Sequence, residues 1–169
     1  MISELDNYLN RLDDLHNQIS GLIAELPSEA LNWRPIEGKD DHITNSLAVL
    51  AAHLAGAEHF WMAEVIEGRP ETRDRDAEFV TVATSATEII QLLEKAAGET
   101  REVFSTLNES DLNGTRQTKG RVVPVRWCIL HVIDHTSLHL GHMQMTYQLW
   151  TGGKAVHSPL WTERLPQEK

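Results

Sequence analysis

The chain has 169 residues, which is enough for one domain with a sizeable hydrophobic core. Its net charge of −10 argues against a nucleic-acid partner, because proteins that bind phosphate backbones present a basic face. No apolar run reaches the roughly 18 to 20 residues of a membrane span, and the acidic N-terminus is unlike a signal or transit peptide. The single cysteine excludes an internal disulfide and suits a reducing cytoplasm. We therefore expect a single cytoplasmic domain over residues 1–169.

Hydrophobic periodicity predicts four long amphipathic helices, over residues 3–26, 42–67, 85–107 and 124–152. Pro27 ends the first helix, and Gly68 follows the second. Ser85 and Glu88 form a capping box at the start of the third, and Pro124 fits the first turn of the fourth. Four such helices with two long connections predict an all-α four-helix bundle.

The connections are predicted to be irregular, over residues 28–41, 69–83 and 108–123. In the second, the block RDRD at residues 73–76 is expected to be a solvated charge cluster, while Phe79 and Val80 hold the loop against the bundle. In the third, Val122 and Val123 are expected to be extended, but without a pairing partner and hence without a sheet.

Four histidines cluster in the fourth predicted helix, namely His131, His135, His139 and His142. At about 100° per residue, their spacing puts them on one narrow stripe. Cys128, Val132 and Met143 share or flank the stripe, so we expect the histidines in the middle of the buried face. A buried imidazole has two nitrogens to satisfy, and a divalent metal ion would satisfy several at once.

The helical interpretation yields a candidate metal site. His53 lies on the apolar arc of the second helix, and His135 and His139 can point at one ion because residues i and i+4 are neighbours. Sites in bundles are built from facing helices, and three neutral imidazoles hold Zn²⁺ while leaving a coordination position open. The alternative is that these histidines are core residues bonded to one another, to carboxylates and to water.

Several neighbouring residues have open roles. His131 and His142 lie one turn to either side of the central pair and are candidate ligands, hydrogen-bond donors or proton shuttles. His16 faces the core of the first helix and either reaches the site or is a satisfied core histidine. Glu58 is interpreted as a packing or orienting residue, and His59 is expected on the solvent side.

Three segments resemble the DinB-like superfamily of four-helix-bundle metalloenzymes, which includes YfiT-like proteins and thiol-dependent transferases. They are NWRPIEG, then SLAVLAAHLAGAEHFW with a histidine followed by glutamate and tryptophan, and HVIDHTSLHLGHMQ, which looks like the HxxxHxGQ signature. They span most of the chain in the expected order. The resemblance implies His53, His135 and His139 as metal ligands. His142 replaces the glutamine of the signature, which leaves open whether the metal has only three histidine ligands.

The resemblance also implies a chemistry, in which a metal binds and activates a low-molecular-weight thiol that is transferred or isomerises a substrate. Zinc is the first choice, with nickel, manganese or iron as others. A small-molecule S-transferase is the favoured prediction, and a metal-dependent hydrolase is the alternative, with His142, His131 and His16 as candidate bases. A non-catalytic metal-binding stress-response module and a metal-free interaction protein stay open. We expect a homodimer with a small-molecule substrate and no nucleic-acid or membrane partner.

Overall fold

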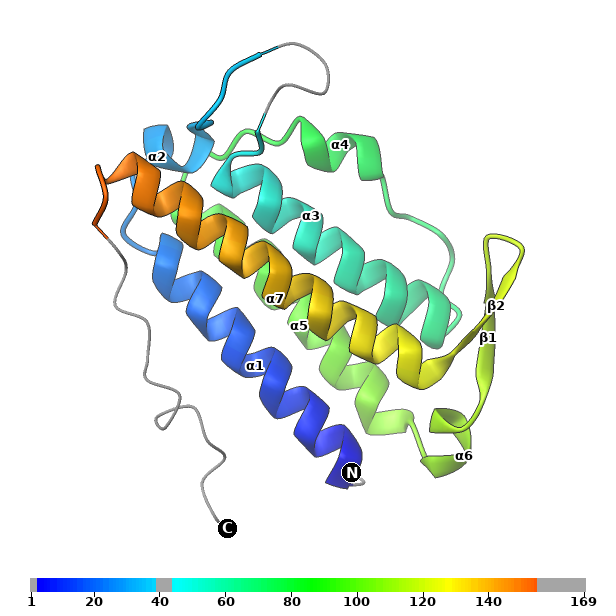
Figure 1. Cartoon of the computed structure of the whole chain (residues 1–169). Coiled ribbons are helices and arrows are strands. Elements are labelled where there is room, and N and C mark those ends of the chain that lie inside the picture. Colours follow the sequence, from blue (N-terminus) through cyan, green and yellow to red (C-terminus); the bar gives the residue numbers. More distant parts are fainter. Residues whose placement is uncertain (1–2, 39–43, 155–169) are drawn as a thin grey trace.

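The computed structural model describes residues 3–38 and 44–154 and shows a bundle of long helices (Figure 1). The long helices are α1 (Ser3–Ile23), α3 (Leu47–His59) continued by the π-helix η2 (Phe60–Ile66), α5 (Ala86–Thr106) and α7 (Val125–Trp150). Shorter elements join them, namely α2 (Ser28–Asn32), α4 (Arg75–Phe79), α6 (Glu109–Leu112), β1 (Thr115–Thr118) and β2 (Arg121–Pro124). The predicted all-α bundle is confirmed. Within the two described ranges, no helix is both long and apolar enough to cross a membrane.

The four long helices surround one hydrophobic core. In Figure 1, α7 lies in front, between α1 and α3, and α5 lies behind. Large side chains with less than 2 % exposure fill the interior, among them Leu5, Leu12, Ile19, Met62, Ile89, Leu93 and Phe104. Ser46 caps α3 by accepting a hydrogen bond from the backbone of Val49, and Ser85 caps α5 as predicted.

The helix boundaries differ from the prediction at two ends. The first helix ends at Ile23, and the second begins at Leu47 rather than at residue 42. Residues 42 and 43 of the predicted helix lie outside the described ranges, and residues 44–46 precede the helix because Ser46 occupies its N-cap. The last turns of the second helix widen into η2, a form that is rare in proteins and frequent at functional sites.

The prediction that residues 108–123 contain no sheet was wrong. Strands β1 and β2 form an antiparallel hairpin in which Val122 pairs with Gln117 and Val123 with Arg116. The two turn residues, Lys119 and Gly120, have positive φ angles of 47° and 74°, as a tight two-residue hairpin turn requires. The partner strand reads TRQT, which has no hydrophobic alternation to reveal it.

The connection at residues 69–83 also differs from the prediction. It contains the short helix α4, which lies beside α3 (Figure 1), and the side chain of Arg73 is only 15 % exposed. The RDRD block is therefore not a wholly solvated cluster. Phe79 packs inward as expected, but Val80 is 73 % exposed and does not hold the loop.

A buried polar cluster joins three of the long helices. His16 Nε2 of α1 is 2.7 Å from Glu58 Oε2 of α3, and Thr100 of α5 donates a 2.6 Å hydrogen bond to Glu58 Oε1. All three residues are buried. His16 is therefore a core histidine paired with Glu58, and Glu58 orients it within the core. Their side chains stabilise the association of α1, α3 and α5.

Removing Glu58 should destabilise the fold strongly. A Glu58→Ala substitution leaves His16 buried without its partner, and breaking a buried ion pair in this way costs about 3–5 kcal/mol. The free energy of unfolding in urea measures the effect. The control is Glu94→Ala on the exposed side of α5, which should change that free energy by less than about 0.5 kcal/mol. Equal losses in the two variants would contradict the assigned role.

The same pair makes stability depend on pH. Burial alone would lower the pKa of His16, but the hydrogen bond and charge of Glu58 outweigh it and raise the pKa above 6.5. His16 therefore stabilises the fold below pH 6.5, and this contribution is lost as the pH rises through the folded pKa. An NMR titration should place the His16 midpoint above 6.5 in the native protein. In Glu58→Gln the midpoint should fall below 6.5, and an unchanged midpoint would refute this account.

Candidate metal centre

Three histidines from two helices converge at the interface of α3 and α7. One ring nitrogen each from His53, His135 and His139 lies within 4.8 Å of the other two. His53 Nε2 is 3.1 Å from His135 Nε2, and the His135 and His139 ring centroids are 4.5 Å apart. Among the described residues this is the one group of three or more histidine, cysteine or acidic side chains with such spacing. The structure thus brings together the three residues selected from the sequence.

The donor set fits a divalent metal ion. At Zn–N distances of about 2.0–2.1 Å, ligand nitrogens in a tetrahedral site lie roughly 3.3 Å apart. The 3.1 Å separation of His53 and His135 is close to this value, and small side-chain rotations would close the wider spacing of the set. The three residues could therefore share one ion.

Two of the three rings, those of His135 and His139, are in the protonation state that a metal requires. Burial, followed by the neighbouring imidazoles, lowers the pKa of His135 to about 3. Burial and the His53 and His142 rings lower the pKa of His139 to about 4. Both rings are consequently neutral near pH 7 and have lone pairs available.

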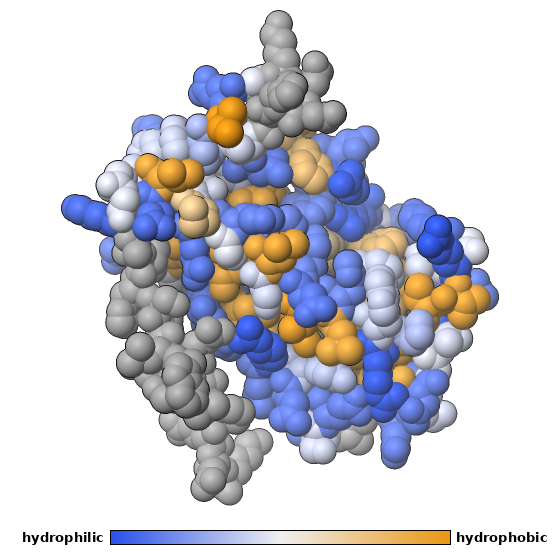
Figure 2. Space-filling view, in the orientation of Figure 1, coloured by the Kyte–Doolittle hydropathy of each residue, from blue (hydrophilic) through white to orange (hydrophobic). Residues whose placement is uncertain are grey.

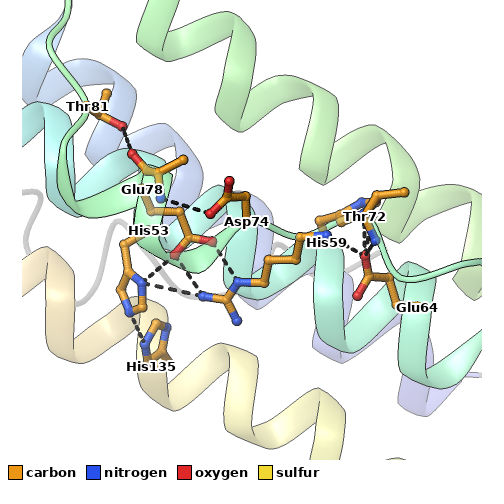
Figure 3. A network of polar contacts seen from close by, with 10 residues as sticks. His53, His59, Glu64, Thr72, Asp74, Glu78, Thr81 and His135 are labelled. Carbon is orange, nitrogen blue, oxygen red and sulfur yellow. Dashed lines mark hydrogen bonds and ion pairs between the residues drawn. The ribbon is translucent and has the colours of Figure 1, made fainter.

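A carboxylate fixes the orientation of His53 (Figure 3). His53 Nδ1 is 2.8 Å from Glu78 Oε2, so a proton on Nδ1 leaves the Nε2 lone pair directed toward His135. Arg73 donates two hydrogen bonds to the same carboxylate, with Nε 2.6 Å from Oε1 and Nη2 2.9 Å from Oε2. The Phe79 ring lies 5.1 Å from the His53 ring and limits its rotation. These contacts select one tautomer and one ring position.

Glu78 and Arg73 were not predicted as site residues from the sequence. Glu78 lies 25 residues after His53, in a connection whose alternating charges are typical of a solvated loop. No helical spacing relates the two residues, because only the path of the connection over α3 brings them together. The single sequence signal is Phe79, an aromatic residue inside this charged stretch.

Gly56 provides the space that Glu78 occupies. A Cβ atom at Gly56 would lie 2.7 Å from Glu78 Cδ and closer still to Oε1, which no real side chain tolerates. Gly56 follows His53 by one turn of α3, so the absent side chain lets the carboxylate reach the imidazole. A glycine in mid-helix is otherwise unfavourable by about 1 kcal/mol relative to alanine.

His131 and His142 flank the group, as the stripe predicted. The His131 ring lies 5.7 Å from the His135 ring and stacks on Trp127, and burial lowers its pKa. His142 Nδ1 is 3.2 Å from His139 Nδ1, which leaves His139 Nε2 for an ion. His142 is exposed, so it contacts a candidate ligand from the solvent side.

The stripe lies at the edge of the buried face of α7, and the prediction that it occupies the middle was wrong. The most buried positions of α7 lie on the neighbouring side of the helix, and they include Val125, Cys128, Ile129, Val132, Thr136 and Met143. This shift turns the histidines toward α3, where His53 meets them, rather than into the core. Cys128 is the small buried hydrophobe that was predicted, and burial raises its pKa to about 11.

Two other predicted residues lie elsewhere. His16 bonds Glu58 in the core and is not part of the three-histidine group. His59 was expected on the solvent side, but its Nδ1 is 2.6 Å from Glu99 on α5 and its side chain is only 23 % exposed. The difference arises because α5 packs against this side of α3 and supplies a carboxylate.

Replacing Gly56 should weaken metal binding without unfolding the protein. Gly56→Ala displaces the Glu78 carboxylate, and loss of such an orienting partner typically lowers metal affinity about 10–100-fold. A Zn²⁺ titration against a chromophoric chelator measures the affinity. Gly98→Ala is the matched control, because Gly98 also lies within a helix and a Cβ there meets nothing within 4 Å. Equal affinities in the two variants would show that Gly56 has no such role.

Comparison with known proteins places the chain in a family. A family model described as the DinB superfamily matches residues 11–143. No curated protein gave a match. A conserved protein from Enterococcus faecalis has a similar structure, with a TM-score of 0.73, 18 % identity and coverage of 90 % of this chain and 99 % of that chain. A DinB-like protein from Bacillus cereus ATCC 10987 has a TM-score of 0.69, 18 % identity and coverage of 91 % and 97 %. At such identity the two structures show the fold alone, but the family model spans most of the chain, and the protein belongs to the DinB superfamily.

Proposed function

We propose that the protein is a metal-dependent enzyme, namely a small-molecule S-transferase that uses a low-molecular-weight thiol. His53, His135 and His139 would hold one divalent ion, with Zn²⁺ as the first choice and Ni²⁺, Mn²⁺ or Fe²⁺ as others. The observation that carries the proposal is the convergence of three imidazoles with no fourth protein ligand among the described residues. Three protein ligands are typical of catalytic zinc sites, in which an outside molecule takes the remaining position.

The residues around the ion would have separate tasks. A bound Zn²⁺ would lower the pKa of a thiol or water enough to make it nucleophilic near neutral pH. Glu78 and Arg73 hold His53 in the required tautomer. In S-transfer, the thiol sulfur forms a bond to the acceptor carbon and the leaving group departs. We propose His131 or His142 as the acceptor of the thiol proton, since each contacts one of the ligands.

Hydrolysis is the second candidate, and the position of His142 favours it. His142 is exposed and contacts His139, so solvent reaches this side of the histidine group. A hydrolase would need only water as the nucleophile and a neighbouring base. Ester cleavage without added thiol distinguishes this reaction from S-transfer.

We also propose a homodimer, a small-molecule substrate and a cytoplasmic location, with no nucleic-acid or membrane partner. The net charge of −10 supports the absence of a nucleic-acid partner. Large apolar side chains exposed along α7 support the dimer, namely Leu130, Leu138, Met145 and Leu149.

Metal analysis tests the proposal. We expect about one equivalent of divalent metal per chain by mass spectrometry, and its loss in His135→Ala. A chelator should lower the melting temperature, since a ligand at 100 times its Kd stabilises the folded state by about 2.7 kcal/mol. Asp134→Ala, an exposed neighbour on the same helix, is the control and should keep its metal.

An activity assay follows on the metal-loaded protein. Thiol consumption with a chromogenic electrophile should require the metal and should fall in His131→Ala or His142→Ala while the metal stays bound. Protein that binds none of the four metals would refute the proposal. Metal binding without thiol transfer or ester cleavage would favour the non-catalytic module.

A further inference from the structure

A second feature of the structure is an aromatic groove between η2, the β-hairpin and the start of α7. Its volume is about 510 Å³, within the roughly 300–1,000 Å³ range of small-molecule sites. Three aromatic rings line it, from Phe60, Trp61 and Trp127, and Val122 faces them from β2. Figure 2 shows hydrophobic side chains gathered over the hairpin at the right of the view. Val122 is 59 % exposed there, so part of this apolar wall faces solvent.

Trp127 and Trp61 connect one wall of the groove with the candidate metal ligands, because both contact His131. The Trp127 ring stacks on the His131 ring at 4.8 Å with an interplanar angle of 4°, and the Trp61 ring meets its edge at 5.3 Å. The His131 ring is in turn 5.7 Å from the His135 ring. A molecule in the groove would therefore contact the two indoles, and the His131 ring lies between these indoles and His135.

Phe60 connects the other wall with the same group of histidines, because it contacts Arg73. The guanidinium carbon of Arg73 lies 5.7 Å from the centroid of the Phe60 ring, and Arg73 also holds the Glu78 carboxylate that orients His53. Two separate chains of contacts thus connect the groove with His135 and His53.

The mouth of the groove is cationic on a strongly acidic protein. Lys119 and Arg121, at the hairpin turn and the start of β2, both line it. Lys119 Nζ is 2.9 Å from Glu71, which offsets its charge. The Arg121 side chain is exposed and makes no hydrogen bond or ion pair with any residue in the described ranges. Its guanidinium is therefore available to a carboxylate, sulfonate or phosphate.

We propose that the groove binds an organic anion with a flat aromatic body. The aromatic part would pack against Trp61, Trp127 and Val122, since aromatic rings associate at centroid distances of 4.5–7 Å. The anionic group would bind Arg121 at the mouth. The whole chain carries a net charge of −10 and repels anions, so the cationic mouth selects where such a ligand binds.

Calorimetric titration with 2-naphthoate tests the binding site, with the neutral 2-naphthylmethanol and the cationic 2-naphthylmethylammonium as comparisons. The acid should bind at least about tenfold more tightly than the alcohol, one order of magnitude being typical for a charged hydrogen-bonded pair. Arg121→Glu should abolish this preference, and Arg121→Lys should keep part of it. Lys95→Glu, at an exposed position of α5, is the control with the same change of charge. Equal affinities for acid and alcohol, or an equal effect of Lys95→Glu, would overturn the proposal.

A second set of measurements separates the groove from the metal centre. His135→Ala should lose the metal but still bind 2-naphthoate, because Arg121 and the aromatic walls remain. Trp127→Ala should keep the metal and bind 2-naphthoate at least about tenfold more weakly, as expected for loss of an aromatic wall. A native protein that binds 2-naphthoate selectively but no metal would refute the proposed function and still support the anion site. A metal-loaded protein that binds no naphthoate would refute the groove alone.

Discussion

The centre depends on one hydrogen bond, from the imidazole of His53 to the carboxylate of Glu78. Three neutral imidazoles facing one another leave lone pairs and N–H groups in conflict unless the tautomer of at least one is fixed. Glu78 fixes it for His53, and Arg73 in turn holds Glu78 with two short contacts. The residues that fix the His53 ring therefore lie in the connection at residues 69–83, whereas the three histidines lie on the long helices. This division explains why a loop with so many charges is packed against the bundle.

Helix α3 carries two polar clusters that have opposite protonation. Toward α7, burial and neighbouring rings lower the pKa values of His135 and His139, so these two rings are neutral. Toward α1 and α5, Glu58 raises the pKa of His16 and favours a charged imidazole. His53 and Glu58 are separated by little more than one turn of the same helix, yet they face different neighbours. The three-histidine group and the structural ion pair are thus kept apart because they lie on different sides of α3.

The sequence predicted the bundle and the three histidines because both follow from helical periodicity. His135 and His139 are one turn apart on α7, and His53 lies on an apolar arc of α3. Their angular positions around the helices therefore predict which side of each helix they share with the core residues. The hairpin was missed because its first strand, TRQT, is polar and carries no alternation. Glu78 and Gly56 were missed because their relation to His53 exists only across a connection, in three dimensions. The displacement of the histidine stripe to the edge of the buried face depends on how α7 rotates against its neighbours, which periodicity alone does not determine.

The absence of a side chain at Gly56 has a consequence for protein engineering. The three histidines could be grafted onto another four-helix scaffold by copying one helical pair and one facing position. Such a graft would carry the three histidines. It would lack both the glycine that leaves space on the helix surface and the loop whose Glu78 side chain fills that space. The transplanted imidazoles would sample both tautomers and several rotamers, and ion selectivity would suffer first. A faithful transplant therefore needs the segment from His53 to Phe79 as one continuous unit.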